Sequence, residues 1–119
     1  NPEVGAYWWM FARCLAATKA DPRAALERSA ACPPHRDLGE VLRELTELLF
    51  RAKDWSALEK AVKQQLRASL APTPRMCLML AECLHATGKS PARIAADGLR
   101  LPAEGFETEV ARLRELAAK

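Results

Sequence analysis

The feature that most constrains this chain is a helix-breaking signal that recurs at nearly constant spacing. Short breaks fall at Lys19–Asp21, Lys53–Trp55 and Gly88–Ser90, which begin 34 and 35 residues apart. Each break separates an apolar helical segment from a second, amphipathic one. Because one helix pair cannot bury its own apolar face, pairs of this length stack on one another. The spacing therefore predicts three stacked helix pairs.

Composition indicates that the chain is all-α. Alanine occurs 23 times and leucine 17 times, whereas valine, isoleucine and threonine together occur only ten times. Alanine and leucine lose little conformational freedom in a helix, and β-branched residues are the usual strand formers. The 119 residues suit one domain.

Capping residues and prolines place the helix boundaries. We expect approximate repeats at 5–38, 39–73 and 74–104, followed by a capping helix at 105–118. Short loops make neighbouring helices antiparallel. The expected fold of residues 1–119 is a right-handed solenoid of three antiparallel helix pairs plus the capping helix. The predicted helix starts are at Asp21-Pro22, Asp37, Asp54, Thr73-Pro74 and Ser90-Pro91.

Apolar residues at helical spacing predict the buried face of each segment. In the last segment, Glu107, Arg112 and Arg114 are expected to face water, and His35 reads as a surface residue in a loop. The predicted stripes are Trp8, Phe11, Ala12 and Leu15; Leu38, Val41, Leu42, Leu45, Leu48 and Leu49; Leu58, Ala61, Val62 and Leu66; and Phe106, Val110, Leu113 and Ala117.

These residues resemble the tetratricopeptide repeat family, over nearly the whole chain and with degenerate repeats. Trp8 fits the family's bulky residue early in the first helix, and Ala12 and Ala81 fit its small residue where two helices touch. Thr46 is a looser match at that position. Ala24 fits the family's alanine early in the second helix, while Leu58 and Arg93 depart from it. The rival architecture is an irregular bundle of six or seven helices.

The resemblance implies that the first helix of each pair lines a concave groove. The groove candidates are Trp9, Met10, Arg13 and Ala17 from the first pair, Glu40, Arg43, Glu44, Glu47, Phe50 and Arg51 from the second, and Arg75, Leu78, Met79, Glu82 and His85 from the third. Tryptophan, methionine and arginine are enriched at protein interfaces. We expect Trp9, Met10, Phe50, Leu78 and Met79 to be apolar contacts, with the arginines orienting an acidic partner. Two alternatives stay open: Trp9 and Met10 pack under another segment, and Phe50 belongs to the core.

The predicted function is a protein–protein interaction scaffold that binds a partner peptide or helix in the groove. The alternatives are a small chaperone for a secretion or assembly subunit and an architectural segment of a longer helical-repeat protein. Family members that hold chaperone tails grip a terminal carboxylate with lysine and asparagine. Asparagine occurs here only at position 1, which argues against that function.

Other classes lack their sequence signals. The net charge of +3 is interspersed along the chain, whereas nucleic-acid binders concentrate basic groups. No apolar run approaches the ~20 residues of a membrane span. Cys83 and His85 lie two residues apart and cannot face each other on a helix, so no catalytic pair is expected. Met76, Met79 and Cys83 are interpreted as core rather than as a metal site. We expect no enzyme activity, metal or cofactor, and a reducing, cytoplasmic compartment for the four cysteines.

Overall fold

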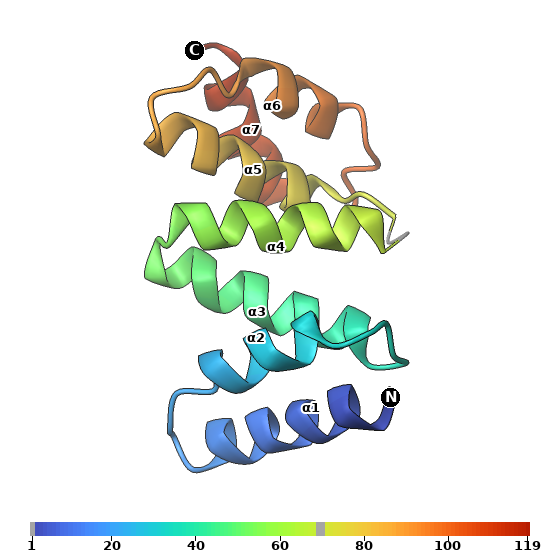
Figure 1. The fold of residues 1–119 in the computed structure, drawn as a ribbon. Helices are drawn as coiled ribbons and strands as arrows, with labels where there is room; N and C mark the ends of the chain where they lie inside the picture. The colour runs from blue at the N-terminus through green and yellow to red at the C-terminus, as the bar shows by residue number, and fades with distance from the viewer. Residues whose placement is uncertain (1, 69–70) are drawn as a thin grey trace. The chain divides into compact units, whose positions relative to one another are not determined.

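The computed structural model describes residues 2–68 and 71–119, and within these it contains seven helices and no strand (Figure 1). The all-α prediction is therefore confirmed for the described residues. The expected repeat 39–73 includes two positions, 69 and 70, outside them. The helices are α1 (Pro2–Ala17), α2 (Arg23–Ala31), α3 (Leu38–Ala52), α4 (Trp55–Arg67), α5 (Pro74–Ala86), α6 (Ala92–Leu99) and α7 (Glu107–Ala117).

The chain divides into two compact units, residues 1–51 and residues 52–119. The first unit holds α1, α2 and nearly all of α3, and the second holds α4 to α7. The single domain expected over residues 1–119 stays a prediction.

Helices α4 and α5 begin directly after their predicted capping residues, whereas α2 and α6 begin after Pro22 and Pro91, one residue later than predicted. The side chain of Thr73 accepts a hydrogen bond from the backbone N–H of Met76 at 3.2 Å, and Asp54 accepts one from Ala57 at 3.4 Å. Before α2, Asp21 accepts from the N–H of Arg23 at 3.0 Å. These bonds satisfy N–H groups that have no partner inside the helix.

The three sequence breaks share one backbone conformation. Lys19, Lys53 and Gly88 all have positive φ, at 61°, 56° and 80°. After α1 the N–H of Ala20 donates to the carbonyl of Leu15 at 2.8 Å, and after α5 the N–H of Lys89 donates to Leu84 at 2.8 Å. A left-handed residue followed by such a bond is a common helix stop. The recurring sequence signal is thus a recurring helix C-terminus.

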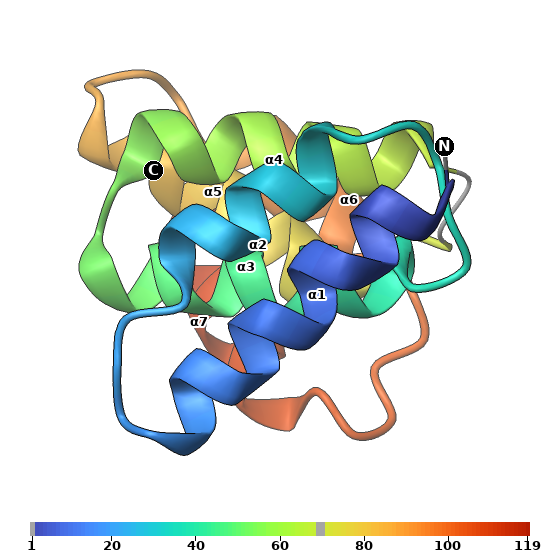
Figure 2. The same cartoon turned by 60° about the horizontal axis from the view of Figure 1, so that its bottom comes forward.

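In the first unit, α1 packs against α2 (Figure 2) through its small residues. Gly5 and Ala12 are buried, whereas Phe11 is 43% exposed and Trp8 and Leu15 are only partly buried. The predicted stripe is therefore confirmed at Ala12, holds only in part at Trp8 and Leu15, and was wrong at Phe11. A close approach of two helices needs small side chains between them, so the large ones lie at the margin.

The expected small-residue positions are buried, with one shift in register. Ala12, Thr46 and Ala81 are each at most 2% exposed. Ala24 is exposed, and its neighbour Ala25 is buried instead. The inward face of α2 therefore begins one residue later than predicted.

In α4 the buried face includes a polar residue. Leu58, Ala61 and Val62 are buried as predicted, but Leu66 is 39% exposed and Gln65 takes the inward position. Among the described residues, Gln65 Oε1 has no hydrogen-bond partner. The spacing 58, 61, 62, 65 follows the helical period more closely than 58, 61, 62, 66, which accounts for the error.

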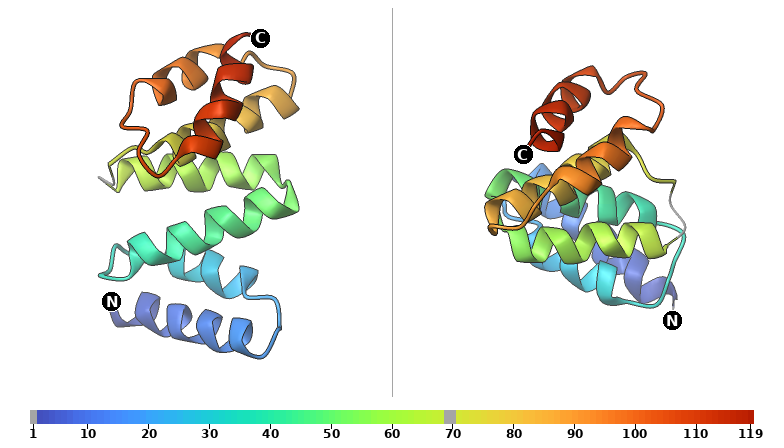
Figure 3. Two further views of the ribbon diagram at one scale, coloured as in Figure 1. Left: turned by 180° about the vertical axis from the view of Figure 1, so that it is seen from behind. Right: turned by 90° about the horizontal axis from the view of Figure 1, so that it is seen from above.

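The second unit has its core where α5, α6 and α7 meet. Leu78, Ala81, Ala95, Leu113 and Leu116 form one buried cluster. Figure 3 shows α7 lying along α5 and α6, and it packs against both. A Cβ on Gly98 of α6 would lie 2.7 Å from Cβ of Cys77, so glycine permits this approach. No helix in the described part of the chain is both long and apolar enough to cross a membrane.

Candidate functional site

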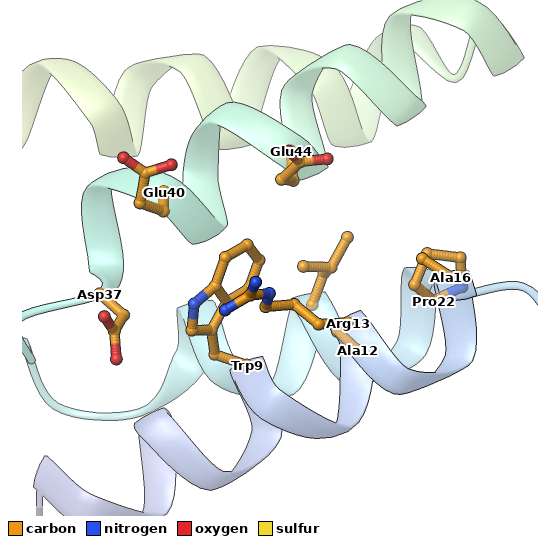
Figure 4. Close-up of a pocket in the computed structure, with 9 residues that line it drawn as sticks. Trp9, Ala12, Arg13, Ala16, Pro22, Asp37, Glu40 and Glu44 are labelled. Carbon is orange, nitrogen blue, oxygen red and sulfur yellow. The ribbon is translucent and has the colours of Figure 1, made fainter. Parts of the chain in front are cut away.

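The first unit contains an open cavity of about 540 Å³. Residues from α1, α2, α3 and the segment before α3 line it (Figure 4). The lining residues are Trp9, Ala12, Arg13, Ala16, Pro22, Leu26, Asp37, Glu40 and Glu44.

Helical spacing explains how these residues come to share one cavity. Positions 9, 12, 13 and 16 form one face of α1, positions 22 and 26 are four apart at α2, and positions 37, 40 and 44 follow the same spacing at α3. Side chains three and four residues apart lie on the same face of a helix. The cavity is thus bordered by one face from each of three helices.

One wall of the cavity is aromatic and cationic. The guanidinium carbon of Arg13 lies 5.7 Å from the centroid of the Trp9 ring, a cation–π contact. In Figure 4 these two side chains lie side by side, with Glu40 and Glu44 across the cavity on α3. Buried Ala12 and Leu26 supply an apolar floor.

The opposite wall is acidic. Glu40 pairs with Arg43 at 3.2 Å, and Asp37 pairs with Arg36 at 3.5 Å. Glu44 forms no hydrogen bond or ion pair with any described residue. It is therefore the carboxylate most available to a ligand.

Four of the groove candidates lie together in the lining of the cavity. Trp9 and Arg13 line it together with Glu40 and Glu44, all four of them groove candidates. Met10 does not, because successive residues are rotated by about 100° around a helix. The other α3 candidates, Arg43, Glu47, Phe50 and Arg51, lie on the same helix but outside the lining.

The third group of candidates needs correction. Leu78 is 5% exposed and Met79 is 2% exposed, so neither offers an apolar contact to a partner. Leu78 instead packs in the core beside Leu113 and Leu116 of α7. Helical spacing on α5 was compatible with either role, and the position of α7 decided between them.

The charged candidates on α5 are engaged by α7. Both nitrogens Nε and Nη2 of Arg112 donate to the Glu82 carboxylate at 3.0 Å, and Arg75 pairs with Glu109 at 3.6 Å. The expectation that Arg112 faces water was therefore wrong. Its hydrogen bonds to Glu82 and then to Glu115 raise the pKa of the guanidinium. Burial, with the nearby charges of Glu59 and Glu82, raises the pKa of the Cys83 thiol to about 11, which keeps it protonated and weakly nucleophilic.

The first unit also contains a buried polar cluster that the sequence did not predict. Ser29 Oγ donates to the carbonyl of Gly5 at 2.7 Å and lies 3.3 Å from Nε2 of His35. The prediction that His35 is a surface residue was wrong, because its ring is partly buried against Gly5. Ser29 is fully buried and cannot reach a substrate, so the cluster ties the segment after α2 to α1.

Five lining residues were not among the groove candidates: Ala12, Ala16, Pro22, Leu26 and Asp37. Asp37 and Pro22 were assigned to helix starts, and these starts are what place them at the rim. They line the cavity because of the way α1, α2 and α3 pack together, and residue spacing along the sequence does not predict that packing. No group of three or more histidine, cysteine or acidic side chains in the described ranges has the arrangement of a metal site.

Comparisons with known proteins leave the site without a precedent. The chain matches no protein-family model, no curated protein and no solved structure. The resemblance to the tetratricopeptide repeat family accordingly stays a prediction.

Proposed function

We propose that this chain is a protein–protein interaction module that holds a segment of a partner protein along α1 and α3. The observation that carries the proposal is the 540 Å³ cavity of the first unit, lined by Trp9 and by residues of both charge signs. Pockets of roughly 300–1,000 Å³ with an apolar floor and a few polar groups are typical of ligand sites. The partner segment is a peptide or helix that inserts a side chain there.

The proposed architecture is a right-handed solenoid of antiparallel helix pairs of the tetratricopeptide type. Two observations support it. The left-handed stops recur at Lys19, Lys53 and Gly88, and the equivalent positions Ala12, Thr46 and Ala81 are all buried. We further propose that the chain binds its partner without catalysis, metal or nucleic acid. We also propose that it works in a reducing compartment, and the four free thiols support this.

A selection from a random peptide display library tests the proposed function. The whole chain is the bait, and each enriched peptide is then titrated against the wild type and two variants. We expect Trp9→Ala to weaken binding by about tenfold or more, since buried tryptophans dominate interface energies. Tyr7→Ala is the matched control, because Tyr7 lies on α1 outside the cavity and is 64% exposed.

Two results would contradict the proposal. One is a selection that enriches no peptide. The other is a set of peptides whose affinity is unchanged by Trp9→Ala. Circular dichroism melts of both variants confirm that any loss of binding is not a loss of folding.

One further observation favours the architectural alternative. Val4, Tyr7, Met10 and Phe11 of α1 are all at least 43% exposed, which leaves a large apolar surface on one helix. Solenoids cover such surfaces with a neighbouring helix or a polar cap. Peptides that depend on Tyr7 rather than on Trp9 would favour this function over the groove.

A further inference from the structure

The charges around the cavity differ from those that the sequence suggested. Three carboxylates line it, from Asp37, Glu40 and Glu44, against the single guanidinium of Arg13. Two other arginines that were expected to face the partner do not line the cavity: Arg43 pairs with Glu40 on the exposed side of α3, and Arg75 pairs with Glu109 of α7. Because Asp37 and Glu40 already pair with Arg36 and Arg43, Glu44 is the lining carboxylate that no described residue neutralises.

Arg13 shows what kind of group the Trp9 ring accepts. Its guanidinium lies over the indole at 5.7 Å from the ring centroid, yet it forms no ion pair with any of the three carboxylates across the cavity. A cation is thus held by the ring while Glu44 stays unpaired among the described residues. A second cation that enters between the ring and α3 would pair with Glu44 and compete with Arg13 for the Trp9 ring.

The floor suits the stem of a long basic side chain. Ala12 and Leu26 are buried and apolar, and Pro22 lies beside them in the lining. Lysine and arginine bury their methylene groups on such surfaces while the charged end reaches a polar partner. An acidic side chain would instead meet the like charge of Glu44, which costs affinity.

We propose that the cavity binds a lysine or arginine side chain of the partner segment, with its stem on Ala12 and Leu26, its cationic end at Glu44, and the Trp9 ring beside it. This inference rests on the proposed function and names the partner's chemistry. It replaces the acidic partner that the groove arginines suggested.

Peptides from the display selection test the inference directly. We expect one basic position to recur among them. Citrulline in place of arginine, or norleucine in place of lysine, removes the charge and keeps a side chain of similar length. Either replacement should weaken binding by about tenfold. Glu44→Gln should weaken the parent peptide similarly, and the two changes combined should cost little more than either alone, because they remove the same pair.

Arg13 supplies a prediction of opposite sign. Arg13→Ala removes a like charge and uncovers the indole, so binding of the basic peptide should tighten by about threefold or more. Arg51→Ala is its control, because Arg51 is exposed on α3 outside the lining. Glu104→Gln, exposed in the second unit, is the control for Glu44→Gln. Neither control should change affinity by more than about twofold at physiological salt.

The outcomes separate the inference from the function on which it rests. A selection without binders overturns both. Peptides that need Trp9 but carry no recurrent basic residue leave the function standing and overturn the inference. Acidic peptides whose binding weakens in Arg13→Ala also overturn it, since the arginine would then be the ligand's partner.

Discussion

Lys19 and Lys53 adopt a backbone conformation that Gly88 adopts without steric cost. A side chain in the left-handed region costs roughly 1 kcal/mol, because Cβ approaches the carbonyl oxygen. A Cβ at Gly88 would meet no atom within 4 Å, so packing does not obscure the backbone effect there. The three helix stops therefore form a natural series for measuring that cost.

We expect Lys53→Gly to raise the free energy of unfolding by about 0.5–1 kcal/mol and Gly88→Ala to lower it by about 1 kcal/mol. Urea denaturation measures both changes. The matched control is Lys60→Gly, the same substitution at an exposed position within α4, which should lower stability by about 1 kcal/mol. Equal effects at positions 53 and 60 would mean that the helix stop carries no strain.

Gly5 is constrained by space rather than by its backbone. A Cβ there would overlap the imidazole ring of His35. Gly5→Ala should therefore lower the free energy of unfolding by about 1–3 kcal/mol, the usual cost of overpacking. In a His35→Ala background the same change should cost much less, and a chemical denaturation cycle measures the difference. Additive effects would show that the two residues do not touch.

Helix α7 has a polar anchor on α5. The Arg112 guanidinium makes two hydrogen bonds of 3.0 Å to Glu82 on α5, and its Nη1 makes a third of 2.8 Å to Glu115 on α7. The Arg112 side chain is 35% exposed and that of Glu82 is 19% exposed, so solvent screens the pair only in part. Forked geometry of this kind strengthens an ion pair beyond a single contact.

We expect Arg112→Ala to lower the free energy of unfolding by about 1 kcal/mol. A double-mutant cycle with Glu82→Gln should give a coupling energy of about 0.5–1 kcal/mol that falls as salt is added. Arg100→Ala provides the control, because that exposed side chain pairs with Asp97 only at 3.9 Å. A coupling energy of zero would show that the Arg112–Glu82 pair does not help to hold α7.

At the scale of the whole molecule, ligand binding should raise the free energy of unfolding. A peptide that binds only the folded chain, at about 100 times its Kd, adds about 2.7 kcal/mol. For a chain of this size that raises Tm by on the order of 10 °C. Differential scanning calorimetry measures the shift, and Trp9→Ala should abolish it. If melting shows two transitions, only that of residues 1–51 should move. A shift confined to residues 52–119 would contradict the placement of the site.

Much of the secondary structure followed from local signals. The caps at Asp54 and Thr73 and the breaks at Lys19, Lys53 and Gly88 act within a few residues of chain, so their positions were predictable. The α3 stripe was predictable for the same reason, since Val41, Leu42, Leu45 and Leu49 are all buried. Four of the nine lining residues, Trp9, Arg13, Glu40 and Glu44, were groove candidates from the family resemblance.

The roles of individual side chains depended on what each helix face meets. Trp8 and Phe11 were expected inside, but Gly5 and Ala12 let α2 approach closely and leave the large residues at the margin. Leu78 and Glu82 were expected at a groove, but α7 covers them. Hydrophobic periodicity shows that one face of a helix is apolar, but it does not show which other helix covers that face.

The sequence by itself determined the helices, their ends and the residues that share each face, because these depend on interactions between positions at most a few residues apart. Only the tertiary structure decided that α7 packs on α5, that His35 packs on Gly5, and that acidic residues of α3 face Trp9. These contacts are distant in the chain: Gly5 and His35 are 30 residues apart, and so are Glu82 and Arg112. They are selected by shape and charge between surfaces, which no local pattern records.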